Sequence, residues 1–515
     1  RTAALSDADG DGNLGGDPVS EISWATQAGY PLLATLQCLP LAATMLLLIM
    51  RQHEQALRLG RLFAIAELAV AIDLYGRIDV ANGNLQFAER LDLFAYHAAA
   101  DGISVLFILL TALLGVLLSF YGMARQQISP VHLLGVLLVI ESSQMTMLTT
   151  MNLLWFAAAS ALQLTLVGYL LWRWASAREE NLALSRFLQY QLFGWCLFLA
   201  GAVVIVWSHA DVVGGRWSFD LLDLLHTPQI DKYQSAAFYL LFYGLAIRTP
   251  LFPLHGWLPN SAGYGLIAVG PVLLLGVKVG VYGMARFLLP LTAEAVLIWQ
   301  SYVVAFAMIG VFFAASMAFR QANLRRLMAF AVVSHTSLIV IGLFTLHPAG
   351  LQGALLLAVN FGLAITVMLL MVGYVYRRTG TTALDRLGGL FDRVPFIALA
   401  FLIGGLALLG MPGTPGFDAV HLVLEASIDT FGALPTIATA LGNVAAAGFL
   451  LWAFQRAFLA PRPRDLPAAR IARTGAMEYF VGGATLIVLL AAGFYPEPRL
   501  QLTDSATQAL AAYFQ

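Results

Sequence analysis

The sequence is poor in charged residues, which make up 11% of its 515 residues, whereas soluble globular proteins carry about 25%. A surface with so few charges would not remain solvated, which excludes an ordinary soluble enzyme. The net charge of −1 excludes a nucleic-acid-binding protein that depends on a basic face. Only two cysteines are present, Cys38 and Cys196, both in apolar runs. Neither a disulfide framework nor a cysteine-based metal site can be built from them.

Long apolar runs dominate instead, since 60% of the residues are hydrophobic and the mean hydropathy is +0.79. The runs are continuous rather than alternating, which indicates helices and not the strands of a membrane barrel. At about 20 apolar residues per crossing, they predict an all-α polytopic membrane protein with about 14 transmembrane helices. The predicted spans lie near 30–50, 62–76, 101–123, 131–150, 152–174, 187–207, 235–257, 264–289, 296–318, 326–346, 351–376, 394–428, 434–458 and 476–495.

Arginines are distributed unevenly over the loops between these spans. With the N-terminal segment outside, nineteen arginines fall in inner loops, against six arginines and Lys232 in outer segments. Because inner loops are enriched in Arg and Lys, we expect a multi-pass protein of a bacterial-type inner membrane with both termini on the outer side. The outer loop 208–234 contains the apolar run Phe219–Leu225, which predicts a short helix at the membrane surface.

Four titratable side chains interrupt the apolar spans. Lys278 is one of two lysines against twenty-six arginines. It costs about 3 kcal/mol at mid-membrane and can release its proton, unlike an arginine. It therefore either titrates or docks helices through a carboxylate. Arg248 either lines an ion path or reaches the inner face. Glu141 needs a cation, so we expect it near Arg248 or Lys278. His335 either relays protons or forms a packing hydrogen bond.

Proline-rich segments are expected to break two spans, the one near 235–257 and the long one near 394–428. The breaking residues are Pro250, Pro253, Pro412, Gly413 and Pro415. Asp418 and His421 follow the second break. They line a polar cavity or face the outer interface.

Each broken span is the fourth helix of a block of five. An odd number of helices inverts the second block relative to the first, which predicts two inverted repeats. The predicted units are a polar N-terminal segment 1–28, three helices 29–123, repeats 131–289 and 296–458, and a C-terminal helix and tail 476–515. The acidic run 7–13 resembles the start of a calcium loop, but Pro18 stands where that loop needs glutamate. We therefore expect a polar tail there and no metal site.

These motifs resemble the antiporter-like subunit M family of respiratory complex I (NADH–quinone oxidoreductase), which is shared with Mrp-type antiporters. The resemblance covers about residues 90–500. It is carried by Tyr96-His97 with Asp101-Gly102-Ile103-Ser104, Arg248-Thr249-Pro250 through Pro253, His255 and Trp257-Leu258-Pro259, Lys278 with Tyr282-Gly283 and Arg286, Gln321 through Leu327 with Val333-Ser334-His335, Gly388-Gly389-Leu390, and Gly410-Met411-Pro412-Gly413-Thr414. It implies a proton-translocating membrane subunit with other membrane subunits as partners and no cofactor of its own.

The resemblance also implies a proton path, of which the sequence keeps only a part. The family's lysine on its eighth helix, histidine on its tenth and carboxylate on its fourth match Lys278, His335 and Glu141. The lysine of the seventh helix is replaced by Arg248, and the histidine of the eleventh by Asn360.

Two acids of the family path are missing. The glutamate of the fifth helix falls near Ser160-Ala161, and that of the twelfth near Val420. The sequence therefore resembles a divergent paralogue with a partly degenerate path.

Three functions remain open from the sequence. The first is a proton-translocating subunit of a complex I-like assembly. The second is a non-pumping coupling or structural subunit, as in inorganic-carbon (CO2/bicarbonate) uptake complexes built on the same family. The third, an independent antiporter, is disfavoured because the family works in assemblies. An enzyme with its own redox centre is disfavoured as well, since the sequence lacks a cysteine cluster and a glycine-rich nucleotide turn.

Overall fold

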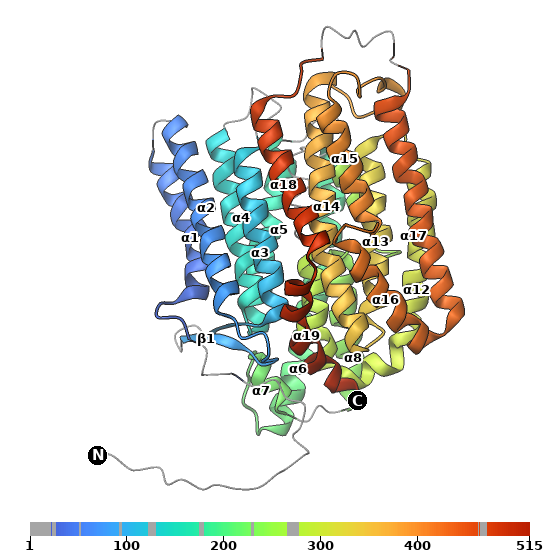
Figure 1. Ribbon diagram of the computed structural model, residues 1–515. Coiled ribbons are helices and arrows are strands. Elements are labelled where there is room, and N and C mark those ends of the chain that lie inside the picture. The colour runs from blue at the N-terminus through green and yellow to red at the C-terminus, as the bar shows by residue number, and fades with distance from the viewer. Residues whose placement is uncertain are drawn as a thin grey trace.

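The computed structural model describes residues 22, 27–50, 53–91, 95–121, 130–174, 180–227, 231–264, 278–461, 463 and 471–515. These residues form an all-α membrane protein whose long helices run side by side (Figure 1). Ten of the described helices are long and apolar enough to cross a membrane. The acidic run 7–13 lies outside the described residues.

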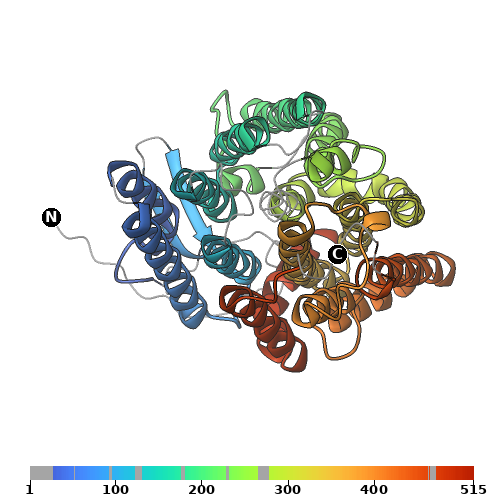
Figure 2. The same cartoon turned by 90° about the horizontal axis from the view of Figure 1, so that it is seen from above.

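Described helices overlap the predicted spans, except that residues 265–277 of the span near 264–289 lie outside the described residues. The first half contains α1 (Leu32–Ile49), α2 (His53–Arg77), α3 (Gly102–Phe120), α4 (Pro130–Thr149), α5 (Leu153–Trp174), α6 (Glu180–Val212), α7 (Leu221–Leu225), α8 (Asp231–Arg248) and α9 (Leu258–Tyr264). After helical residues 278–283 and the π-helical turn Met284–Leu288, the second half contains α11 (Leu289–Leu291), α12 (Ala293–Phe319), α13 (Leu324–Leu343), α14 (Pro348–Thr379), α15 (Pro395–Leu408), α16 (Gly416–Phe431), α17 (Ala433–Phe454), α18 (Ala476–Phe494) and α19 (Glu497–Ala511). Seen from above, α1 and α2 form one edge of the bundle and α12 and α17 the opposite edge (Figure 2).

Helices are interrupted at both proline-rich segments. α8 ends before Pro250 and Pro253, and a helix resumes only as α9, because proline cannot donate to the helical hydrogen-bond ladder. Residues 409–415 separate α15 from α16. Gly410 and Gly413 adopt φ of +70° and +81° there. These values lie in the left-handed region, which glycine adopts readily and residues with a Cβ disfavour.

One end of the bundle carries a β-hairpin that the sequence did not predict. β1 (Gln86–Leu91) pairs with β2 (Tyr96–Ala100) in antiparallel fashion, within a segment we expected to be a polar loop. The same end, named here the hairpin end, also carries α7 and the C-terminus (Figure 1). α7 confirms the short helix expected in the loop 208–234.

The hairpin holds the start of α1. The carboxylate of Glu89 on β1 accepts hydrogen bonds from the backbone N–H groups of Leu33 and Ala34, at 2.8 and 2.9 Å. These donors belong to the first turn, where no intrahelical acceptor exists for them. The hairpin therefore caps a helix that has no side-chain cap of its own.

Glycines bring α8 close to α6. A Cβ added to Gly244 would lie 2.7 Å from the backbone nitrogen of Phe198 and 2.8 Å from the carbonyl oxygen of Gly194. Gly201 similarly faces Leu241. Small residues at such contacts let membrane helices approach until their backbones touch. This packing fixes α8, and with it the charged residue at its end.

Candidate functional site

Lys278 lies in the interior of the bundle, with 1% of its surface exposed. Its Nζ is 3.9 Å from the ring centroid of Phe361 on α14, a cation–π distance. Among the described residues, the ammonium group has no hydrogen-bond acceptor. A Cβ at the neighbouring Gly362 would lie 3.0 Å from the Cε atom of Lys278, so a glycine makes room for this side chain.

His335 on α13 packs against the same aromatic ring. The centroids of its imidazole and of the Phe361 ring are 5.4 Å apart, and it interacts electrostatically with Lys278. The histidine is 2% exposed, and its Nε2 has no partner among the described residues. Lys278, Phe361 and His335 therefore form one buried cluster, in which neither the Nζ of Lys278 nor the Nε2 of His335 has a hydrogen-bond partner among the described residues.

Arg248, the last residue of α8, is paired with neutral groups. Its guanidinium donates to Ser160 Oγ and Gln163 Oε1 on α5 and lies 3.7 Å from Met147 Sδ. The Nε2 of Gln163 donates in turn to Gln144 Oε1 on α4, at 2.7 Å. Ser160 thus contacts Arg248 at the position near which the resemblance leads us to expect an acid. The sequence analysis missed Gln163, an uncharged polar residue in an apolar span.

Within the described ranges Glu141 forms no ion pair with Arg248, Lys278 or another cation, so that expectation is wrong. Its carboxyl group fills the space beside Gly115 on α3 and interacts with Glu67 on α2. The reason lies in the geometry of α4. Met147, which contacts Arg248, is six residues from Glu141 and therefore about 120° away around the helix. Glu141 and Met147, the residue of α4 that contacts Arg248, therefore lie on different faces of the helix.

The second helix break carries another polar group. The Nδ2 of Asn360 on α14 donates to the carbonyl oxygen of Pro415 at 2.5 Å. Arg499 on α19 donates to Asn360 Oδ1 and to the same carbonyl, both at 3.2 Å. It also forms an ion pair with Asp418 at 3.5 Å. Arg499 thus contacts two predicted site residues, Asn360 and Asp418. The sequence analysis placed Arg499 in the C-terminal tail and did not select it. His421 is exposed on α16 and lies outside this group.

A third polar cluster lies at the hairpin end, on the helical face that continues from Lys278. Tyr282 and Arg286 follow Lys278 at intervals of four residues, so all three share one face. Arg286 donates to Asp101 Oδ1 at 2.6 Å and to the Tyr282 hydroxyl at 3.1 Å. Ser104 lies within 3.2 Å of both the tyrosine hydroxyl and the guanidinium.

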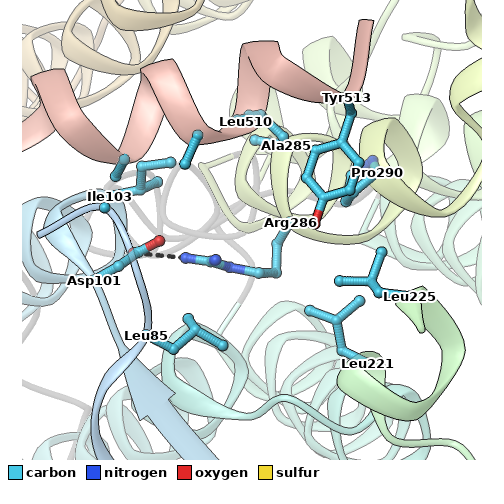
Figure 3. A pocket seen from close by; sticks show the side chains of 13 residues that line it. Leu85, Asp101, Ile103, Leu221, Leu225, Ala285, Arg286, Pro290, Leu510 and Tyr513 are labelled. Carbon is cyan, nitrogen blue, oxygen red and sulfur yellow. Dashed lines mark hydrogen bonds and ion pairs between the residues drawn. The ribbon is translucent and has the colours of Figure 1, made fainter. Parts of the chain in front are cut away.

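This cluster borders a small cavity (Figure 3). Figure 3 shows Arg286 reaching from one wall towards Asp101, with Tyr513 and Leu510 on one side and Leu221 and Leu225 of α7 on the other. The cavity has a volume of about 30 Å³, which is room for one or two water molecules. In the described part of the chain, no group of three His, Cys, Asp or Glu side chains is arranged to hold a metal ion.

The sequence matches the family described as "NADH:quinone oxidoreductase/Mrp antiporter, TM" over residues 150–444. It is 30% identical over 431 residues to NADH-quinone oxidoreductase subunit M of Pseudomonas aeruginosa, covering 81% of this chain and 82% of that protein. It is 28% identical over 426 residues to subunit M of Escherichia coli strain K12, covering 81% and 83%.

Solved structures share the fold over almost the whole chain. A chain of respiratory complex I from Thermus thermophilus aligns with a TM-score of 0.84 and 26% identity, covering 94% of this chain and 100% of that one. A chain of the Mrp complex from a Dietzia species aligns with a TM-score of 0.81, covering 94% and 99%. At 19% identity, the second likeness concerns the fold alone.

Proposed function

Because the chain belongs to the NADH:quinone oxidoreductase/Mrp antiporter family, we propose that it is a proton-translocating membrane subunit of a multi-subunit, complex I-like assembly. The observation that carries this proposal is the buried cluster of Lys278, Phe361 and His335. An ammonium group inside an apolar bundle, with no acceptor among the described residues, is a costly feature that structural packing does not require. This cost indicates that the ammonium group of Lys278 serves to carry a proton.

In the proposed mechanism, Lys278 and His335 exchange the proton. Lysine can release a proton in the membrane and take it up again, and histidine can do the same. Because neither the Nζ of Lys278 nor the Nε2 of His335 has a hydrogen-bond partner among the described residues, the proton passes between them through intervening water. Asn360, Arg499 and Asp418 then continue the polar row towards the hairpin end, where Asp418 offers a carboxylate that is partly exposed.

Arg248 acts in this mechanism as a fixed positive charge. An arginine practically never loses its proton, and its acceptors Ser160 and Gln163 are neutral. The residue therefore influences Lys278 electrostatically but passes no proton itself. Translocation through the first repeat is consequently weak, and the remaining activity depends on the second.

The proposed topology follows the charge asymmetry of the loops. The chain crosses the membrane fourteen times, with two inverted five-helix repeats at 131–289 and 296–458. The hairpin end and both termini face the outer side. The polar N-terminal segment 1–28, the three helices of 29–123 and the C-terminal part 476–515 flank these repeats.

A non-pumping coupling subunit, for example of an inorganic-carbon uptake complex, is the second candidate. The specific observation in its favour is that neutral Ser160 and Gln163 stand opposite Arg248 where the family places an acid. Purification of the native complex through a tag on this chain would identify its partner subunits. Reconstituted into vesicles, that complex should acidify or alkalinise the lumen on turnover. A complex that turns over without moving protons would favour the coupling role.

A further inference from the structure

Glu67 and Glu141 form a carboxyl pair in the interior of the bundle, between α2 and α4. Glu67 is 1% exposed and Glu141 5% exposed, and the two groups interact directly. Both oxygens of Glu67 and the Oε1 of Glu141 have no hydrogen-bond partner among the described residues. Gly115 on α3 provides the space that the Glu141 carboxyl group occupies.

Among the residues that the structure describes, no neighbouring element supplies a cation to this pair. α1 and α3, which pack against α2 and α4, contain no acidic or basic residue, and the one charged residue of α5 is Arg173 in its last turn. On α2 itself, Arg61 donates to the carbonyl oxygen of Ser119 and lies over the Phe120 ring. The His97 ring of β2 binds Asp220 at the hairpin end.

Two ionised carboxylates cannot share such a site, because each would repel the other and neither is compensated. One proton removes the repulsion, since a protonated carboxyl group can donate to its neighbour. From this juxtaposition we propose that Glu67 and Glu141 bind a proton as a pair, at a site separate from Lys278 and His335. The proton binds to a carboxylate oxygen and is shared as an O–H···O hydrogen bond between the two side chains.

The pair is also placed to influence Arg248. Glu141 lies one helical turn from Gln144, whose Oε1 accepts from Gln163, the residue that binds the guanidinium. Loading or emptying the pair changes the charge one helical turn from this chain of hydrogen bonds, which reaches Gln144. The pair therefore provides a proton-binding site between α2 and α4, two helices that hold neither Lys278 nor His335.

Infrared difference spectroscopy on the assembled complex tests the proposal. Wild type should show the C=O stretch of a protonated carboxyl group in apolar surroundings, with a shift in D2O. Glu67→Gln and Glu141→Gln each keep the side-chain shape and should each change the frequency of this band and the pH at which it disappears. The double variant should lose it. Glu54→Gln is the matched control on the same helix, since Glu54 is 89% exposed, and should leave the band unchanged.

Three results would overturn the proposal. The band is absent from wild type, or it remains in the double variant, or Glu67→Gln leaves the Glu141 band and its titration unchanged. Addition of Na⁺ to the wild-type complex provides a test without any variant. Loss of the band at constant pH would assign the pair to a metal cation instead of a proton. Because this spectrum is independent of proton flux, its outcome does not decide the proposed function.

Discussion

Replacement of Gly244 by alanine tests whether the close contact of α6 and α8 holds the arginine site. The added Cβ would lie 2.7 and 2.8 Å from two backbone atoms of α6, which no rotamer change can relieve. Such overpacking costs about 1–3 kcal/mol. Alanine regains about 1 kcal/mol through its higher helix propensity. We expect a net loss of stability of up to about 2 kcal/mol.

Gly483→Ala is the matched control for this substitution. Gly483 lies inside α18, and a Cβ there meets no atom within 4 Å. This variant should gain up to about 1 kcal/mol from helix propensity alone. Thermal release of the subunit from the purified complex, measured on wild type and both variants, should therefore shift in opposite directions.

The same experiment also concerns function, because Arg248 lies one helical turn beyond Gly244 on α8. Separation of α8 from α6 would displace the guanidinium from Ser160 and Gln163. Proton flux should fall in Gly244→Ala and remain unchanged in Gly483→Ala. Equal stability and equal flux of the two variants would refute the reasoning.

Three further predictions follow from individual contacts. Arg248→Lys should be tolerated or increase proton movement, because lysine keeps the charge and can release its proton; reduced flux relative to wild type in vesicles would contradict this. Asp101→Ala should destabilise the complex by about 3–5 kcal/mol, because it leaves the guanidinium of the buried Arg286 without its ion-pair partner. Loss of the N-terminal cap of α3 should add about 1 kcal/mol. Asp101→Asn keeps the cap and should therefore cost less in thermal unfolding. Burial raises the pKa of Glu89 above its ordinary 4.5, although its two backbone hydrogen bonds oppose this. Its contribution to stability is then present at low pH and lost as the pH rises through the raised value, so Glu89→Gln should flatten the pH dependence of thermal stability above pH 4.5; an unchanged dependence would exclude this role.

The sequence predicted the membrane helices and their breaks because both depend on local composition. Continuous apolar runs leave few alternatives to helices in a bilayer, and prolines end helices wherever they occur. The β-hairpin was missed because its formation does not depend on local composition alone. Its strands are short and lie in a polar segment, and tertiary contact with the start of α1 stabilises them.

The site was only partly predictable, because its contacts join residues distant in the sequence. Lys278 and His335 were identified by their charge in apolar runs, and the structure brings them together around Phe361. The rule that buried opposite charges pair gave the wrong partner for Glu141. Glu67 was not selected at all, since no sequence pattern indicates that two acids from different helices meet.

The most direct test of the central claim is proton flux in vesicles that contain the whole complex, measured for wild type, Lys278→Ala and Lys278→Arg. Arginine keeps the positive charge beside Phe361 but cannot release its proton. We expect both variants to assemble and both to lose flux. Normal flux in Lys278→Ala, with assembly intact, would show that the lysine only docks helices and would contradict the account.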